Sequence, residues 1–462
     1  MNYGCLAWWT IASCFAPLGL VAIQAAERPN VILVLADDVG AAELGCYGNT
    51  LHRTPNLDRM AAEGLKLNTF YSTPLCTTTR LAVMTGQYGH HNGYLGMNRE
   101  AYKPAPDNPQ RDIGNHFTNG DLMKSAGYVT AMAGKWQLSG SHPTLIHDAG
   151  FDEYRMWAYQ HNLPAGVEHT GRWEGQPGQS NTARFWHPSL VQNGKYLPTR
   201  PDDYGPDLLH EFVVDFARRH RSQPFFVYYT SLLTHGPHEE TPDPAQPGQR
   251  KPRGFQSNLE YLDHLMGRLM QDLTELDLAR KTIVILVGDN GTASRGKGSV
   301  TELGARVPFI VWGPGHVQPA AGAEQAVGDI TDLVPTLAEL AGVALPKDRP
   351  FDGQSLVPLF TGKTTRHRDW IYSYLNDGRI LRDARWLLEI PGAGQTERFF
   401  DCGSSRDGSG YRLVTAQSSD EARQARERFA AILAKMPEPR PRFQETDEGR
   451  GKKKNRKKQS VP

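Results

Sequence analysis

Val31-Ile32-Leu33-Val34-Leu35-Ala36-Asp37-Asp38 is an unbroken apolar run that ends in two adjacent carboxylates. Six apolar residues without polar alternation are typical of a strand buried on both faces, as in a parallel sheet covered by helices. Similar runs occupy residues 223–230 and 281–287, and a helical pattern precedes each of them, at 207–219 and 257–276. Strands that alternate with helices predict an α/β fold around a mostly parallel sheet.

The rest of the chain suggests one helix, one loop region and a second small unit. Residues 54–62 are expected to form an amphipathic helix that stops at Gly64. Residues 153–203 are rich in Gly, Pro, Trp and His with little periodicity, which predicts long surface loops. Short apolar runs followed by a helical pattern then predict a small antiparallel sheet with one helix. These runs are 370–374, 379–381 and 385–390, and the helix is 419–435.

The two ends of the chain differ in composition from its middle. Residues 5–23 are almost wholly apolar and are followed by the small residues Ala25 and Ala26, which predicts a secretory leader over 1–26. A membrane anchor and a lipoprotein box at 11–14 are the alternatives. Residues 437–462 are Pro-rich and then strongly basic, and are expected to be a disordered tail that is solvated or touches polyanions.

Length and charge limit the remaining possibilities. The 462 residues predict a large domain over 27–369 and a small one over 370–436. The formal net charge of +1 gives no reason to expect a nucleic-acid partner, and loss of the leader leaves no stable membrane span. The expected location is the periplasm or the exterior.

Once the leader is removed, Cys46, Cys76 and Cys402 are too few and too widely spaced for a disulfide framework.

Polar side chains follow two of the predicted strands at the point where each strand ends. Asp37 and Asp38 follow the first, and Asp289 and Asn290 follow the strand at 281–287. Ligand sites of open α/β sheets gather beyond the carboxyl ends of strands. Carboxylate and amide oxygens suit Ca²⁺, with Mg²⁺ as the alternative, better than zinc. Either pair taken alone is more often an ordinary turn, but together they predict a metal site.

Residues 74–86, Pro-Leu-Cys-Thr-Thr-Thr-Arg-Leu-Ala-Val-Met-Thr-Gly, predict a helix capped by threonine and ended near Gly86. Cys76 then lies at the helix N-terminus, where backbone N–H groups favour an anion. Arg80 follows one turn later on the same face and supplies a fixed positive charge. The alternative is a buried thiol beside a surface arginine.

Six short motifs together resemble the formylglycine-dependent sulfatases, a family of the alkaline-phosphatase-like superfamily. They occur in that family's order over most of residues 28–375. The motifs are Ala36-Asp37-Asp38-Val39-Gly40, Thr54-Pro55-Asn56-Leu57-Asp58, Cys76 to Gly86, Gly134-Lys135-Trp136, Gly288-Asp289-Asn290-Gly291 and Glu302-Leu303-Gly304-Ala305-Arg306-Val307-Pro308. The resemblance implies a large mixed sheet sandwiched by helices, with a small C-terminal antiparallel sheet.

The resemblance also implies a mechanism. A maturation enzyme would oxidise Cys76 to formylglycine (3-oxoalanine), whose hydrate attacks sulfur with one hydroxyl and helps to expel the enzyme-bound sulfate with the other. A metal bound by Asp37, Asp38, Asp289, Asn290 and residue 76 would draw on a sulfate oxygen. Arg80, Lys135 and Lys297 would neutralise the transferred group, and His235 would bind sulfate and help to protonate the leaving oxygen. Gln137 would hydrogen-bond the hydrate. The expected substrate is a sulfated small molecule or glycan, and Trp157, Trp173 and Trp186 either stack on sugar rings or pack.

Two positions depart from the family pattern. Thr78 stands where the maturation motif usually has Pro, sometimes Ala, and Gln137 stands where His is usual two residues after the lysine. A glutamine exchanges no proton near neutral pH, so sulfate release is expected to be slow unless His142 or another group substitutes. The alternatives are a non-catalytic binder of sulfated glycans and a metal-dependent phospho- or phosphonate-ester hydrolase that uses Thr77 or unmodified Cys76.

Overall fold

The computed structural model describes residue 1 and residues 28–96, 113–138, 145–158, 182–406 and 408–436. The expected leader, the basic tail, His142 and Trp173 lie outside these ranges. No helix of the described residues is both long enough and apolar enough to span a bilayer.

A nine-stranded mixed sheet forms the centre of the larger part of the described chain. Its strands are β1 (Asn30–Ala36), β2 (Leu65–Lys66), β4 (Val129–Gly134), β5 (Glu153–Trp157), β6 (Leu190–Gln192), β7 (Lys195–Leu197), β8 (Phe225–Thr230), β11 (Thr282–Gly288) and β12 (Phe309–Trp312), in the order β2-β12-β11-β1-β8-β4-β5-β6-β7. The five from β11 to β5 run parallel, and antiparallel strands extend both edges. The runs at 31–36, 223–230 and 281–287 therefore correspond to neighbouring central strands.

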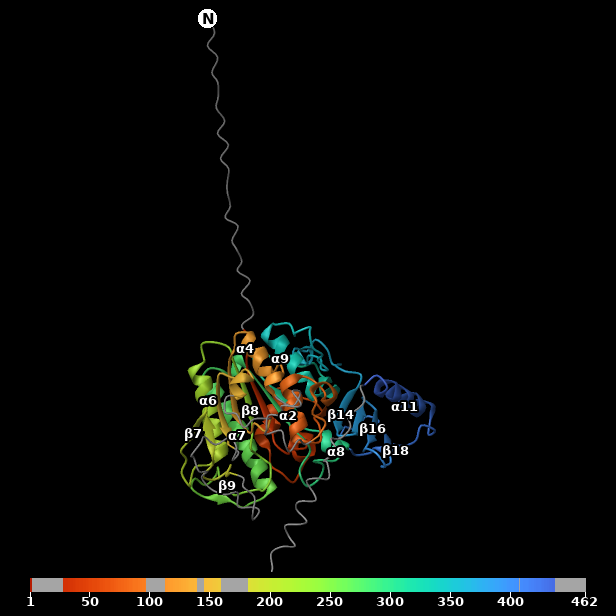
Figure 1. Cartoon of the computed structure of the whole chain (residues 1–462), viewed down its shortest axis with the longest axis horizontal. Coiled ribbons are helices and arrows are strands. Elements are labelled where there is room, and N and C mark those ends of the chain that lie inside the picture. The colour runs from red at the N-terminus through yellow and green to blue at the C-terminus, as the bar shows by residue number, and fades with distance from the viewer. Residues whose placement is uncertain (2–27, 97–112, 139–144, 159–181, 407, 437–462) are drawn as a thin grey trace, which may run out of the picture.

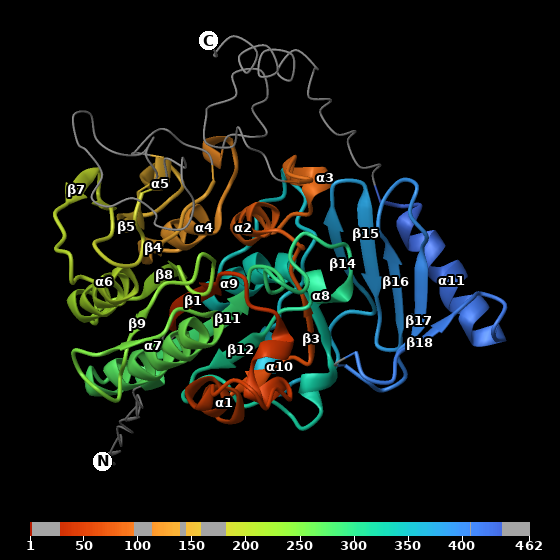
Figure 2. The same ribbon diagram turned by 90° about the horizontal axis from the view of Figure 1, so that it is seen from below.

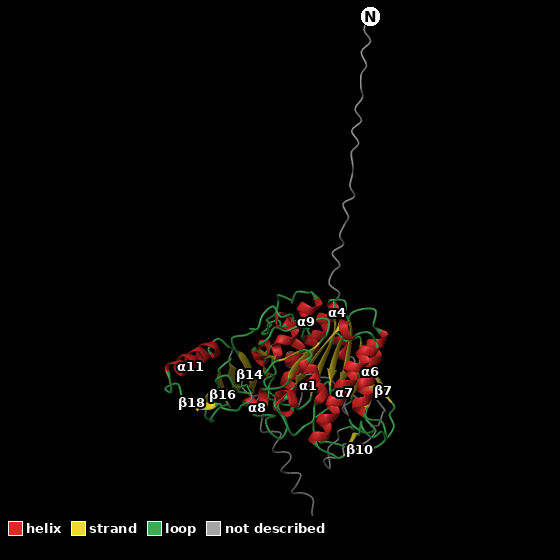
Figure 3. Cartoon of the chain, turned by 180° about the vertical axis from the view of Figure 1, so that it is seen from behind, coloured by secondary structure: helices red, strands yellow, loops and turns green. Residues whose placement is uncertain are grey.

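Helices cover both faces of this sheet. The helices of this part of the chain are α1 (Pro55–Ala62), α2 (Cys76–Thr85), α3 (Gly89–Asn92), α4 (Asn119–Ser125), α5 (Leu145–Asp148), α6 (Gly205–Arg219), α7 (Phe255–Glu275), α8 (Glu302–Ala305), α9 (Leu333–Ala341) and α10 (Val357–Phe360). Alternate residues of β1 point to opposite cores: Leu33 packs in the core shared with α2, α4 and α9, and Val34 in that shared with α1, α6 and α7. Figure 2 shows α2 and α4 on one side of the sheet and α6 and α7 on the other, and Figure 3 shows α1, α6 and α7 across the strands.

The prediction of long surface loops over 153–203 is wrong for its two described ends. β5 alternates, with Tyr154 and Met156 buried and Arg155 partly exposed, and it pairs with β4. Arg155 donates from Nε to Gln192 Oε1 of β6 at 2.9 Å. Pairing with a distant strand overrides the loop-like local composition here. Trp157 is only 4% exposed and therefore packs rather than stacking on a ligand.

A separate five-stranded antiparallel sheet lies beside the main body (Figure 1), as predicted. Its strands are β14 (Ile371–Leu375), β15 (Gly378–Arg382), β16 (Trp386–Ile390), β17 (Arg398–Asp401) and β18 (Arg412–Val414), and α11 (Asp420–Leu433) covers one face through Phe429. The other face packs on Tyr71 of β3 (Thr69–Tyr71), which pairs with β13 (Val327–Asp329), and on Leu75. A short pair of β9 (Thr241–Pro242) and β10 (Arg250–Lys251) completes the strands described. The small sheet thus supports the segment that leads into α2.

Asp263 of α7 fixes the start of α1. Its Oδ1 accepts from the backbone N–H of Leu57, and its Oδ2 accepts from Asn56 Nδ2, both at 2.8 Å. A Cβ on Gly267, one turn later, would lie 2.5 Å from Asn56 Cγ, so only glycine allows the two helices to approach this closely. Burial raises the pKa of Asp263 from 3.8 to about 6, against the lowering effect of these hydrogen bonds.

The raised pKa makes the stability contribution of Asp263 depend on pH. Between pH 3.8 and about 6 the folded state binds more protons than the unfolded state, so stability is lost as pH rises through this window. Asp263→Asn lacks this ionisation, so its stability relative to the parent should improve by about 2 to 3 kcal/mol between about pH 4 and about pH 7. Urea unfolding at several pH values measures the difference. Asp202→Asn, at an exposed position, is the control, and a pH-independent difference for Asp263→Asn would contradict this assignment.

Candidate active site

The predicted site residues lie where four parallel strands end. Asp37 and Asp38 follow β1, and Asp289 and Asn290 follow β11, because β1 and β11 pair in register from Asn30–Thr282 to Ala36–Gly288. Lys135 follows β4, and His235 lies in the loop after β8. The carboxyl edge of the sheet therefore brings together residues such as Asp38 and Asn290, which lie 252 positions apart in sequence.

Close backbone approach fixes Lys135. Gly134, the last residue of β4, has a φ of 109°, and a Cβ there would lie 1.8 Å from the carbonyl oxygen of Thr230. Lys135 N donates to this same oxygen at 3.1 Å. Only glycine fits at position 134, and the lysine side chain is thereby held at the strand ends.

Three carboxylates of the site are almost fully buried, and three cations face them. Asp37, Asp38 and Asp289 are each at most 1% exposed. Lys135 Nζ lies 2.7 Å from Asp37 Oδ2, Lys297 Nζ lies 2.6 Å from Asp38 Oδ1, and Arg80 NH2 lies 2.9 Å from Asp289 Oδ2. These pairs link α2 and the loop after β11 to the strand ends.

Arg80 holds the two sides of the site together. Besides Asp289, its guanidinium donates from NH1 to the backbone oxygen of Lys135 at 2.9 Å, and its NH2 lies 3.6 Å from Asp37 Oδ1. The side chain is fully buried. Arg80 is therefore a fixed internal cation, and the alternative of a surface arginine is excluded.

The carboxylates differ in their electrostatic environment. Burial by itself raises the pKa of Asp37, but the charges of Lys135, His235 and Arg80 outweigh it and hold this pKa well below its usual range. Burial and the neighbouring charge of Asp37 raise the pKa of Asp289 to about 7, despite Arg80. Asp37 therefore stays ionised over a wider pH range than Asp289.

The donor set fits a hard divalent cation. Asp37 Oδ1 and Asn290 Oδ1 are buried, and neither accepts a hydrogen bond from the described residues. Ligand atoms of Asp37, Asp38 and His235 lie within 4.8 Å of one another. Unsatisfied buried oxygens beside carboxylates suit Ca²⁺ or Mg²⁺. The sequence did not suggest that His235 belongs to this compact group.

Cys76 is the first residue of α2 and is 1% exposed. The predicted helix and its end at Gly86, in the left-handed conformation, are confirmed. The predicted threonine cap is wrong: the N-cap is Leu75, and no side chain caps it. Thr78 Oγ1 instead donates to the backbone oxygen of Leu75 at 2.9 Å and also bonds Thr73 Oγ1. The threonines thus brace the turn before the helix.

The loop after β11 places Lys297 near Cys76. Gly298 N donates to the backbone oxygen of Pro74 at 2.7 Å, which joins this loop to the turn before α2. Burial lowers the pKa of Lys297, but the negative charges of Asp38, Asp37 and Asp289 help to outweigh burial and raise it. Arg80, on the same helix, and Lys297, on the adjoining loop, are both close enough to Cys76 to interact with it electrostatically.

His235 is oriented by its neighbours. Its Nδ1 donates to the backbone oxygen of Gly236 at 2.7 Å, so in the neutral ring the other nitrogen, Nε2, carries the lone pair. This Nε2 lies 3.9 Å from Asp38 Oδ2. Burial and the charges of Lys135 and Arg184 hold the pKa of His235 well below 6.5. With its pKa lowered in this way, His235 is a neutral acceptor near pH 7 rather than a proton donor.

Sequence reasoning missed Arg184. Its NH2 donates to the backbone oxygens of His235 and Gly236, and its guanidinium lies 5.2 Å from the ring centroid of Trp157. Arg184 belongs to the stretch that the sequence suggested to be loops, and no local pattern marks it.

Gln137 has a φ of 55°, and its Oε1 is buried without a hydrogen bond from the described residues.

Comparison with known proteins agrees with this geometry. Residues 29–343 match the family model described as Sulfatase. The chain is 31% identical over 393 residues to the N-acetylgalactosamine-6-sulfatase of Canis lupus familiaris, which covers 79% of this chain and 72% of that protein. It is 30% identical over 449 residues to the steryl-sulfatase of Mus musculus, and this match covers 80% of this chain and 70% of that protein. The crystal structure of Ps i-CgsB has the same fold, with a TM-score of 0.71 and 23% identity. The match covers 93% of this chain and 98% of that chain.

These findings confirm the predicted fold class, a large mixed sheet between helices with a small antiparallel sheet, as in alkaline-phosphatase-like proteins. The family match covers the sheet, α2 and every strand end that carries a site residue. The chain therefore belongs to the sulfatase family, a family of sulfuric ester hydrolases.

Proposed function

We propose that this protein is an exported sulfatase that hydrolyses a sulfate ester by means of formylglycine formed from Cys76 and a bound Ca²⁺ ion. The observation that carries the proposal is the group of buried carboxylates, with unsatisfied oxygens on Asp37 and Asn290, near a cysteine that interacts electrostatically with Arg80 and Lys297. Such a set binds a divalent cation on one side and a sulfate group on the other. Release of sulfate from sulfated sugars by the matured protein, with loss of activity on chelation and recovery with calcium, tests it.

The residues of the chain divide the work. Asp37, Asp38, Asp289 and Asn290 would hold the metal, which would polarise a sulfate oxygen and lower the pKa of the attacking hydroxyl. Formylglycine hydrate would supply that hydroxyl. Arg80, Lys135 and Lys297 would bind and orient the sulfate oxygens, because carboxylates fix all three cations, of which Arg80 and Lys135 are buried and Lys297 is partly buried. The negative charge of bound sulfate would raise the pKa of His235, so that Nε2 could hold the proton that the leaving oxygen needs.

The substrate is proposed to be a sulfated carbohydrate. A cavity of about 450 Å³ adjoins the Lys297 loop, and polar residues from this loop and from the small sheet line it, including Ser299, Asn376 and Arg398. A polar cavity suits hydroxylated sugars better than an apolar sterol. The relatives include both an N-acetylgalactosamine-6-sulfatase and a steryl-sulfatase, so a sulfated amino sugar and a steryl sulfate assayed side by side decide between the two classes. Faster turnover of the steryl ester would reject the carbohydrate proposal.

Thr78→Pro is expected to raise the fraction of Cys76 converted to formylglycine, because it restores the third position of the family's maturation motif. Proline is tolerated in the first turn of a helix, where its missing N–H has no intrahelical partner. The change removes the bond of Thr78 Oγ1 to Leu75 and should cost about 1 kcal/mol. Mass spectrometry of the peptide measures conversion, with Thr78→Ser as the control that keeps the hydroxyl. Equal conversion in both variants would show that Thr78 does not limit maturation.

Gln137→His is expected to raise kcat by about tenfold or more, since an imidazole exchanges protons near neutral pH and an amide does not. Histidine is among the residues that accept the left-handed conformation observed at this position, with a φ of 55°. Steady-state kinetics with Gln137→Asn as the control separates proton transfer from shape, because asparagine also accepts this conformation but does not titrate. Equal kcat values in the two variants would mean that another group supplies the proton.

The same glutamine supports a second candidate function, a non-catalytic binder of sulfated glycans. Gln137 stands where the family usually has a titratable histidine, whereas the cations and carboxylates of the site are all present. Tight binding of a sulfated sugar without release of sulfate, in protein shown to carry formylglycine, would favour this candidate over the sulfatase.

A further inference from the structure

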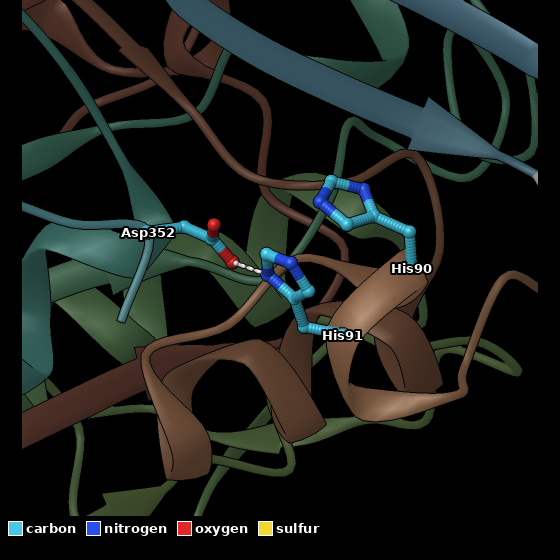
Figure 4. Close-up of side chains that lie close together, drawn as sticks. All are labelled: His90, His91 and Asp352. Carbon is cyan, nitrogen blue, oxygen red and sulfur yellow. Dashed lines mark hydrogen bonds and ion pairs between the residues drawn. The ribbon is translucent and has the colours of Figure 1, made fainter. Parts of the chain in front are cut away.

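A second group of potential metal ligands lies just beyond the helix that carries Cys76. His90 and His91 belong to the short helix α3, and Asp352 lies in the segment that follows α9. One nitrogen of each imidazole and one carboxylate oxygen lie within 4.8 Å of one another. Figure 4 shows the two rings side by side with the carboxylate of Asp352 directed at His91. None of the three residues has a role in the site described above.

Asp352 fixes this group to the end of α2. Its Oδ2 accepts from the backbone N–H of Tyr88 at 2.7 Å, and its own N–H donates to the backbone oxygen of Gly86 at 3.0 Å. The same Oδ2 accepts from His91 Nδ1 at 2.9 Å. The proton between His91 Nδ1 and Asp352 Oδ2 therefore occupies the place that a cation ligated by both atoms would take.

His90 supplies the observation that a purely structural cluster leaves unexplained. Its ring contacts Tyr88 and His91, but within the described ranges no hydrogen bond or ion pair engages its nitrogens. Burial and the adjacent charge of His91 lower the pKa of His90 to about 4, with Arg379 acting in the same direction and Asp352 against it. His90 is therefore neutral near pH 7 and offers a lone pair without a prior loss of a proton.

We propose that His90, His91 and Asp352 bind a divalent transition-metal ion of the Zn²⁺ class, at a site that shares no residue with the Asp37–Asp289 carboxylate site. Two imidazoles and one carboxylate are borderline ligands, which favour Zn²⁺ and its neighbours over Ca²⁺. Ligand atoms around a tetrahedral zinc lie about 3.3 Å apart. Side-chain rotations that move the ligand atoms by about 1 Å would therefore complete the site. Both rings are only partly buried, which leaves room for this movement and for water as the fourth ligand.

The metal would join two distant parts of the chain. It would link α3, which follows the Cys76 helix, to the segment at 350–352 that already bonds Gly86 and Gln87. A ligand that binds only the folded state raises the melting temperature by mass action. Zn²⁺ should therefore stabilise the protein, and binding should release a proton, since the hydrogen bond to Asp352 raises the pKa of His91.

The test is zinc binding to the full chain without a histidine tag. After chelation and dialysis the protein is titrated with Zn²⁺ in the presence of excess Ca²⁺, which occupies the carboxylate site. Calorimetry reports the stoichiometry of zinc binding. The visible spectrum of Co²⁺, bound in place of Zn²⁺, reports the type of ligands. We expect one zinc site, with affinity at least about tenfold weaker in His90→Ala and in His91→Gln. His147→Ala, which removes another partly buried imidazole bonded to Phe151, is the matched control and should bind zinc as the parent does.

Folding of the variants is checked separately by their melting temperatures in chelator. Asp352→Asn keeps an oxygen for the Tyr88 N–H and so preserves the turn, but it lacks the charge of the ligand and should also weaken zinc. No zinc binding in the parent, or binding unchanged in both folded histidine variants, would overturn the proposal. A zinc signal lost instead in Asp38→Asn would assign the ion to the carboxylate site and also overturn it.

Discussion

Cys76→Ala is expected to lower sulfate ester turnover by at least about 10³-fold, since it removes the group from which the proposed nucleophile is made. Cys76 is 1% exposed, and loss of its sulfur atom should cost only about 1 kcal/mol of stability. Asp37, Asp38, Asp289 and Asn290 are untouched, so calcium should still bind, weakened only by loss of the one ligand that residue 76 would supply. Initial rates on a sulfated sugar, together with calcium titrations of both proteins, measure the two effects.

Cys402→Ala is the matched control for this change. Cys402 is also buried, at 2% exposure, but it lies under the small sheet. Its replacement should leave turnover within about twofold of the parent, as is usual for a small change away from the site. Full activity in Cys76→Ala would exclude this residue as nucleophile and would move the role to Thr77. Activity retained on phosphate esters alone would favour the phospho- or phosphonate-ester hydrolase.

Arg80→Met should have the second-largest effect, on stability as well as on activity. The fully buried guanidinium bonds Asp289 and the backbone of Lys135, and methionine leaves these partners without it. Breaking a buried ion pair from one side typically costs about 3 to 5 kcal/mol of unfolding free energy. Loss of a cation on the transferred group should lower kcat by about 10² to 10³-fold. Urea unfolding and steady-state kinetics check both numbers.

Calcium should reduce the stability loss in Arg80→Met, because a divalent cation replaces the missing positive charge beside Asp37 and Asp289. The unfolding free energies are therefore compared in chelator and in calcium. Arg219→Met is the control, since Arg219 pairs with Glu153 at 2.8 Å but is 40% exposed, and an exposed pair contributes about 1 kcal/mol or less. A loss in Arg80→Met that is the same with and without calcium would argue against a metal between these carboxylates.

The part of the fold that the sequence predicts best is the centre of the main sheet. β1 and β11 are buried on both faces, so each appears as a continuous apolar run, and the acidic residues that follow mark where each strand ends. Their parallel register then places Asp37 and Asp289 together without further information. α2 is predictable for a similar reason, since Gly86 supplies the left-handed residue that ends it.

Elements whose partners lie far away in sequence could not be predicted. β5 to β7 form because β4 and β5 pair, and the composition of 153–203 gives no sign of this. Arg184 reaches His235 only through that extension of the sheet. The bonds of Thr78 to Leu75 and Thr73 were likewise missed, because a threonine near a helix start suggests a cap. Local patterns thus locate Cys76 at the start of its helix and the strand ends, whereas the groups that support them depend on tertiary pairing.

The mass of the tryptic peptide 67–80, which contains Cys76 and ends at Arg80, tests the central claim most directly. The protein is purified from its own host, or from one with the maturation system, and the peptide is weighed by mass spectrometry. We expect a population in which an aldehyde replaces the thiol of Cys76. An intact thiol in every copy would contradict the formylglycine mechanism, even if the protein binds calcium and sulfated sugars as proposed.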